Sequence, residues 1–187
     1  MLKAKDPEVQ LFVQCSDALQ EDYPAKKTIW KGSPFEWIQR KPSSTKGAIG
    51  KKLISNYLTR KGFDVYHSPG SEADRVIADK RVAIKTSCLW KSGKYRFQQI
   101  RDQDYDFVMC LGISPSDVHC WVFPKQLMIE KWDSGEISSQ HLGEKGRETS
   151  WFPINPRALP EWIAEQGGSL TEAVNKIIEI TKQKPLP

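Results

Sequence analysis

The side chains that could carry out chemistry gather in residues 71–90, SEADRVIADKRVAIKTSCLW. Asp74 opens a short apolar run, a turn-like Asp-Lys pair follows, and a second apolar run ends at Lys85. Two such runs separated by turn residues predict a β-hairpin, which would bring the carboxylate and the ammonium group together. A carboxylate binds Mg²⁺ through oxygen. The bound metal lowers the pKa of a water and neutralises charge on a phosphate. The layout is therefore typical of a metal-dependent phosphodiesterase site.

The alternation of side chains along a strand assigns these residues to faces. Glu72 and Asp74 would share one face of the first strand, and Ala83 and Lys85 one face of the second. In the simplest register Asp74 and Lys85 converge near the open end of the hairpin. The lysine could then position the attacking water or stabilise the pentacovalent transition state. A basic two-stranded ribbon with one acid is also a common structural element, and the pattern alone leaves that alternative open.

The charge of the chain is concentrated in its middle. The formal net charge is +5, yet residues 25–101 carry 18 basic and 5 acidic side chains, whereas residues 102–187 carry 8 and 13. Residues 1–24 are acidic, with 2 basic and 5 acidic side chains. An excess of positive charge on one part of a chain predicts a surface that binds a polyanion.

Composition narrows the class of protein. Hydrophobic residues make up 39% of the chain and charged residues 27%, as in ordinary soluble domains. No apolar run has transmembrane length, and the N-terminal residues lack the apolar core of a signal peptide, so we expect no membrane partner and no export. The four cysteines form no C-x-x-C pair, which disfavours a zinc site and predicts reduced thiols in a cytoplasm.

The order of predicted elements indicates one α/β or α+β domain over residues 1–187, with a mixed sheet flanked by helices. We divide it into an N-terminal arm (1–45, with a short helix within 1–24 and one helical turn at SPFEWI), a catalytic core (46–125) and a loop-rich segment with closing helices (126–187). In the core we expect a helix over 46–61, capped by Ser43–Thr45 and ended by Gly62. Strands follow at FDVYHS, ADRVIA and RVAIKTS, then a helix from near Phe97, then strands at DFVMCLGI and VHCWVF. The closing helices are LPEWIAEQ and LTEAVNKIIEITK.

These features together resemble the PD-(D/E)XK nuclease superfamily, particularly type II restriction endonucleases. Ala73-Asp74 matches the proline-acid element, and Ala83-Ile84-Lys85 matches the acid-x-lysine element. The lead-in TKGAIGKKLISNYLTRKGFDVYHSPGSEADR and the block YRFQQIRDQDYDFVMCLGISP are also similar to such proteins, and the likeness spans roughly residues 35–125. The resemblance implies a restriction-endonuclease-like fold and a Mg²⁺ cofactor, with Mn²⁺ as a substitute. It also implies that Asp74 and the Ile84 carbonyl bind the metal.

One position departs from that pattern, because Ala83 stands where the family has a glutamate or aspartate. Three interpretations remain open. Glu72 supplies the second carboxylate and joins Asp74 as catalytic residue and metal ligand. Alternatively, an acid has been replaced at position 83, leaving a weak or inactive enzyme. In the third, the protein is a pseudo-nuclease that binds DNA without cutting it.

Several basic and amide side chains are candidates for DNA contacts. Arginine and lysine contacts to phosphate position a duplex, whereas amide and guanidinium contacts to base edges read its sequence. The loop-rich segment could add base readout or dimer contacts. The candidates are Lys51, Arg75, Lys91, Lys94, Arg96, Gln98, Gln99, Arg101, His141 and Arg147.

The resemblance therefore predicts Mg²⁺-dependent hydrolysis of double-stranded DNA by a sequence-specific type II restriction enzyme in a bacterial or archaeal cytoplasm. Palindromic targets imply a homodimer that cuts both strands. A structure-specific nuclease, such as a junction resolvase or a repair nicking enzyme, would use the same site on branched or mismatched DNA. A DNA-binding pseudo-nuclease would keep the basic surface without turnover.

Overall fold

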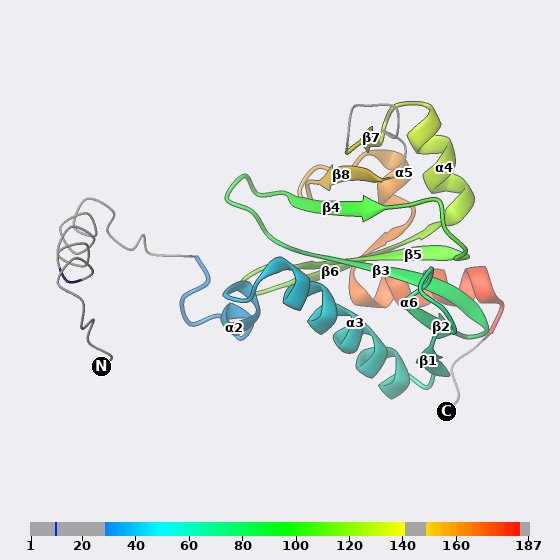
Figure 1. The fold of residues 1–187 in the computed structure, drawn as a ribbon, viewed down its shortest axis with the longest axis horizontal. Helices are drawn as coiled ribbons and strands as arrows, with labels where there is room; N and C mark the ends of the chain where they lie inside the picture. Colours follow the sequence, from blue (N-terminus) through cyan, green and yellow to red (C-terminus); the bar gives the residue numbers. More distant parts are fainter. Residues whose placement is uncertain (1–9, 11–28, 141–148, 184–187) are drawn as a thin grey trace. The chain divides into compact units, whose positions relative to one another are not determined.

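The computed structural model describes residue 10 and residues 29–140 and 149–183 (Figure 1). The chain forms two compact units, residues 1–31 and residues 32–187. The helices and strands described here belong to the second unit. Apart from residue 10, the helix expected within residues 1–24 lies outside the described residues. His141 and Arg147 lie outside them as well.

A mixed sheet of six strands forms the centre of this unit, in the order β1-β2-β3-β5-β6-β9. The pair β3 and β5 is parallel, and every other neighbouring pair is antiparallel. All residues of β5 are buried, as expected for a central strand covered on both faces. The mixed sheet and its first five strands confirm the sequence prediction. The strands are β1 (Val65–His67), β2 (Arg75–Ile77), β3 (Lys80–Cys88), β5 (Phe107–Ile113), β6 (Val118–Pro124) and β9 (Gly167–Gly168).

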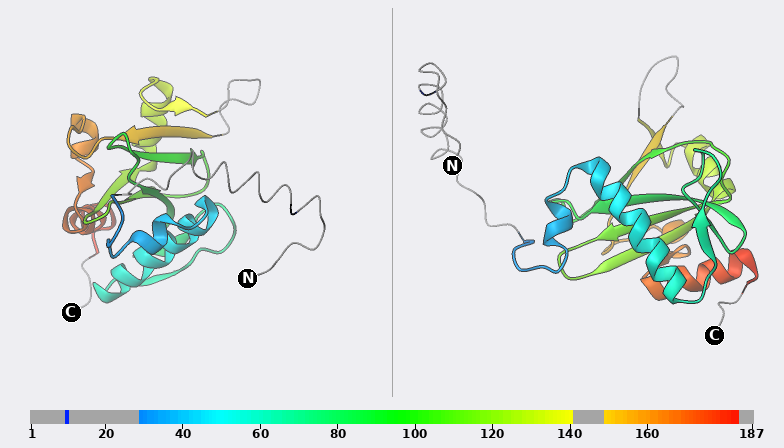
Figure 2. Two further views of the ribbon diagram at one scale, coloured as in Figure 1. Left: turned by 90° about the vertical axis from the view of Figure 1, so that its left-hand side faces the viewer. Right: turned by 60° about the horizontal axis from the view of Figure 1, so that its bottom comes forward.

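Helices α3 (Ser43–Arg60) and α6 (Leu170–Thr181) cover one face of this sheet, and the short α2 (Glu36–Gln39) precedes α3 (Figures 1 and 2). The N-terminal cap predicted for α3 is wrong. Pro42 occupies the cap position without a side-chain hydrogen bond, and the predicted capping residues form the first helical turn instead, because a proline suits the residue just outside a helix start. The predicted end is confirmed, since Gly62 follows the helix with a φ of +83°.

A close approach of backbone and side chain fixes α3 against β3. A Cβ atom on Gly50 would lie 1.9 Å from Thr86 Oγ1, far inside van der Waals contact. Only glycine therefore fits at this crossing. On the same face of the sheet, Ile54 and Leu58 of α3 and Ile177 of α6 are almost fully buried.

A second, three-stranded sheet covers the opposite face, in the order β4-β8-β7. It consists of β4 (Tyr95–Ile100), β8 (Ser150–Ile154) and β7 (Ser138–Ser139). The helix expected from near Phe97 is therefore wrong. Tyr95 and Phe97 are buried and Arg96 and Gln98 are exposed, so the side chains alternate with the period of a strand. Phe97 packs with Phe152 of β8 in the core between the two sheets.

The segment expected to be loop-rich contains regular structure. Besides β7 and β8 it holds α4 (Lys125–Asp133), which begins directly after β6 at the cap residue Pro124. The two closing helices are confirmed as α5 (Glu161–Ala164) and α6. Among the described residues, no helix has the length and apolar character needed to cross a bilayer.

Candidate active site at the edge of β3

The β2–β3 hairpin has the predicted strands and a turn one residue earlier than expected. Ala78 and Asp79 form the turn, with φ values of +49° and +63°, the conformation that two-residue hairpins favour. The register pairs Ile77 with Lys80 and Arg75 with Val82. Because β2 is much shorter than β3, the edge of β3 beyond Val82 is left without a strand partner on that side.

The Asp74 carboxylate takes the place of the missing strand partner. The Asp74 backbone N–H donates to the Val82 carbonyl at 2.8 Å, and the Ile84 N–H donates to Asp74 Oδ2 at 2.7 Å. The N–H and C=O of one strand residue point to the same edge, so the Ile84 carbonyl faces the side on which this carboxylate lies. The second carboxylate oxygen, Oδ1, is 2.5 Å from Lys51 Nζ of α3.

Lys85 lies beside this carboxylate and is held by the second sheet. Its Nζ donates to the Gln99 carbonyl at 2.6 Å. Burial lowers the pKa of Lys85, the Asp74 carboxylate raises it in part, and the neighbouring Lys51 and Arg101 lower it further. Asp74 and Lys85 therefore lie close enough to interact electrostatically. The backbone carbonyl that holds the lysine could not be predicted from the residue pattern.

Gln99 reaches this position through an irregularity in β4. The register between β4 and β8 shifts between Phe97 and Ile100, and Gln99 has a φ of +56°. A positive φ is uncommon for a residue other than glycine. Bulges of this kind often lie beside functional sites. The Gln99 N–H in turn donates to the Gln140 side-chain oxygen at 3.2 Å. The bulge therefore turns a backbone carbonyl of the small sheet toward Lys85.

The site contains more positive than negative charge. One carboxylate, Asp74, pairs with Lys51 and interacts electrostatically with Lys85, and Lys85 in turn interacts with the positive charge of Arg101. A cluster of this composition attracts a singly charged anion such as a phosphodiester group. We call these four residues the edge cluster.

The two positions considered for a second carboxylate lie differently. The Glu72 side chain accepts a hydrogen bond from the Asp104 N–H at 2.7 Å, which ties it to the segment before β5. Ala83 is only 6% exposed and packs in the apolar core between the sheets. Within residues 29–140 and 149–183, no group of three or more histidine, cysteine, aspartate or glutamate side chains could hold a metal ion.

The donor set nevertheless fits one kind of divalent site. Mg²⁺ is usually held by one or two carboxylates together with waters and substrate phosphates rather than by an all-protein cage. Asp74 Oδ1 and the Ile84 carbonyl are hard oxygen donors at one strand edge. They suit an ion that takes its other ligands from water and from a DNA phosphate, provided that Lys51 leaves Oδ1.

The other predicted DNA contacts divide into two places. Arg75 lies by the hairpin, where it donates to Ser55 Oγ at 2.8 Å, to the Asp74 carbonyl at 2.6 Å and contacts His67. The remaining group surrounds β4: the Arg96 guanidinium stacks between Trp90 and Trp151, 4.8 Å from each ring centroid. All four members of that group are exposed: Lys91, Lys94, Arg96 and Gln98.

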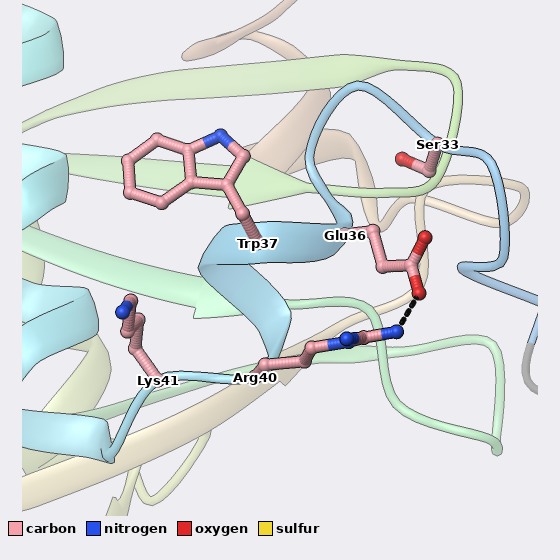
Figure 3. A pocket seen from close by; sticks show the side chains of 5 residues that line it. All are labelled: Ser33, Glu36, Trp37, Arg40 and Lys41. Atoms are coloured by element: carbon pink, nitrogen blue, oxygen red, sulfur yellow. Dashed lines mark hydrogen bonds and ion pairs between the residues drawn. The ribbon is translucent and has the colours of Figure 1, made fainter.

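A hollow of about 450 Å³ lies elsewhere, beside α2, and contains none of the predicted site residues. Figure 3 shows Trp37 on one side of it and the ion pair of Arg40 with Glu36 on the other. Ser33 and Lys41 complete its lining. None of the residues that line this hollow belongs to the edge cluster.

Comparison with known proteins gives a fold but no family. No protein-family model matches the chain, and no curated protein matches it. Among solved structures, the chain is similar to a bacterial homing endonuclease, I-Ssp6803I, with 19% sequence identity and a TM-score of 0.50. The match covers 75% of this chain and 94% of that one. Identity at this level shows a shared mixed α+β fold.

Proposed function

We propose that this chain is a DNA endonuclease that hydrolyses phosphodiester bonds of double-stranded DNA at the edge cluster, with Mg²⁺ as its metal ion. The observation that carries the proposal is the Asp74 carboxylate at the free edge of β3, in electrostatic interaction with Lys85. The fold shared with a protein described as a homing endonuclease supports it. The strongly basic character of residues 25–101 supports a polyanionic substrate.

In this proposal each residue has a distinct role. Asp74 Oδ1 and the Ile84 carbonyl bind Mg²⁺, which would lower the pKa of a water and neutralise charge on the scissile phosphate. Lys85, fixed by the Gln99 carbonyl, donates a hydrogen bond toward the charge that develops on the phosphate oxygens. Arg101 holds a neighbouring phosphate and orients the duplex.

Within the endonucleases, we propose a type II restriction enzyme that acts as a homodimer. This proposal rests on the resemblance of residues 35–125 to type II restriction endonucleases. A junction resolvase or a repair nicking enzyme would place the same residues against branched or mismatched DNA. Glu72 remains the proposed second carboxylate, and it would have to leave the Asp104 N–H to reach the metal.

A second candidate function is DNA binding without hydrolysis. The observation that favours it is Ala83, which lies in the apolar core at the position where the resembling family carries an acid. An edge cluster with a single carboxylate would bind a phosphate and leave it intact.

Incubation with plasmid DNA and Mg²⁺ separates these functions. We expect the wild-type protein to cleave, Asp74→Asn and Lys85→Met to abolish cleavage while folding normally, and EDTA to stop the reaction. Discrete fragments indicate a restriction enzyme, whereas nicked circles or a smear indicate another nuclease. If neither the wild type nor Ala83→Glu cuts, and both bind DNA with a strong salt dependence, the chain is a binding protein.

A further inference from the structure

In the edge cluster, Lys51 and a metal ion would compete for one carboxylate oxygen, Asp74 Oδ1. Asp74 Oδ2 accepts the Ile84 N–H at 2.7 Å, and Asp74 Oδ1 lies 2.5 Å from Lys51 Nζ. The backbone therefore uses one oxygen, and an ammonium group uses the other. A divalent cation that binds Oδ1 meets the Lys51 ammonium group at contact distance, and the repulsion between the two cations favours displacement of Lys51.

The local structure holds the base of Lys51 in place and leaves its tip adjustable. The Lys51 carbonyl accepts from Ser55 Oγ at 2.8 Å, and Ser55 Oγ accepts from Arg75 Nε at 2.8 Å, which ties α3 to the hairpin. The adjacent Gly50 crosses β3 in close contact with Thr86. The Lys51 side chain is 37% exposed, so its four-carbon stem can redirect the ammonium group while α3 stays fixed.

Electrostatics set the order of events at this site. In the free protein, Lys51 neutralises Asp74, and Lys85 and Arg101 add further positive charge nearby. A divalent cation is repelled by this surplus, whereas a DNA phosphate is attracted by it. A phosphate that enters offers Lys51 a second anion, and Asp74 Oδ1 then becomes accessible to the metal.

We infer that Lys51 couples metal binding to DNA binding: its ammonium group occupies the metal-binding oxygen of Asp74 until a DNA phosphate draws it away. The inference rests on the proposed function of the edge cluster as a nuclease site. Coupling of this kind is reciprocal, so DNA raises the affinity for the metal by the factor by which the metal raises the affinity for DNA. Its effect is to prevent the free protein from assembling a loaded site.

The test is a titration with Mn²⁺ alone, followed by calorimetry or by the electron paramagnetic resonance signal of the free ion, and it requires no turnover. We expect Lys51→Met to bind Mn²⁺ about fivefold more tightly than the wild type in the absence of DNA, the upper end for a partly exposed ion pair. Lys52→Met, the neighbouring exposed lysine of α3, should bind Mn²⁺ as the wild type does. Lys51→Arg should also resemble the wild type, because it keeps the charge.

A short mixed-sequence duplex completes the design. It should raise the Mn²⁺ affinity of the wild type by a larger factor than that of Lys51→Met, and Asp74→Asn should remove the gain in both. Equal Mn²⁺ affinities of wild type, Lys51→Met and Lys52→Met, or no binding by any of them, overturn the inference. Tighter Mn²⁺ binding by Lys51→Met without any DNA cleavage supports it and refutes the nuclease function alone.

Discussion

Replacing Gly50 by alanine should force helix α3 away from strand β3. The new Cβ atom would lie 1.9 Å from Thr86 Oγ1 and 2.8 Å from Thr86 Cβ. Carbon atoms in good contact are about 3.5–4.0 Å apart, so both contacts require movement. Thr86 belongs to a β-strand, and its Cβ cannot turn away as the end of a flexible side chain could. The helix therefore has to move.

Two opposing terms set the size of the effect. Inserting a methyl group into a well-packed core costs about 1–3 kcal/mol. Alanine in place of glycine within a helix returns roughly 1 kcal/mol. Because the contact at Thr86 is so short, we expect the upper part of the first range, and a net loss in the free energy of unfolding of about 1–2 kcal/mol.

Denaturant unfolding followed by circular dichroism measures this loss, and Gly47→Ala is the matched control. Gly47 lies in the same helix, and a Cβ atom there would meet nothing within 4 Å. We expect Gly47→Ala to be stabilising by up to about 1 kcal/mol. If Gly50→Ala proved as stable as Gly47→Ala, the close crossing of α3 and β3 would be refuted, together with the fixed base that we assign to Lys51.

Three further changes test other parts of the structure. Ala83→Glu buries a carboxylate in the apolar core, so it should lower the free energy of unfolding by about 2–3 kcal/mol, and Mg²⁺ should raise the melting temperature of this variant more than that of the wild type; equal melting temperatures in metal-free buffer would contradict the burial. Each of Lys91→Ala and Lys94→Ala should reduce the slope of log affinity for DNA against log salt by about 0.9 if the lysine contacts a phosphate, as measured by fluorescence anisotropy, and an unchanged slope in both would remove this loop from the DNA surface. Burial raises the pKa of Cys120 to about 12 and the pKa of Cys110 well above its usual range; both thiols therefore stay protonated in mildly alkaline buffer, and iodoacetamide should label them only after unfolding.

The hairpin could be predicted from sequence because its signals are local. Alternating apolar residues, a two-residue turn and a carboxylate at the strand start all lie within residues 71–90. The neighbourhood of Asp74 and Lys85 follows from that pattern. The second sheet could not be predicted in the same way. Tyr95 and Phe97 are two residues apart, as in a strand, but the bulge at Gln99 places the next buried residue, Ile100, three residues after Phe97. A spacing of three between buried residues is typical of a helix.

The partners of the two lysines also lie beyond the reach of a sequence pattern. Lys51 meets Asp74 from a helix, and Lys85 meets a backbone carbonyl of Gln99, a group that every residue type possesses. The excess of positive charge in residues 25–101 predicts that Lys51 belongs to a polyanion-binding surface. It does not distinguish a lysine that faces solvent from one that is paired with Asp74. Contacts of this kind depend on how α3 and the small sheet pack on β3.

The stacking of Arg96 between two indole rings has a consequence for recognition. A long cationic side chain normally loses rotational freedom when it grips a phosphate, at about 0.5–1.5 kcal/mol for each one ordered. Trp90 and Trp151 already restrict the Arg96 guanidinium, so it meets a ligand with its donors arrayed in advance. Beside the exposed Lys91 and Lys94, Arg96 would give the more directional grip and would set the angle at which a nucleic acid backbone settles on β4.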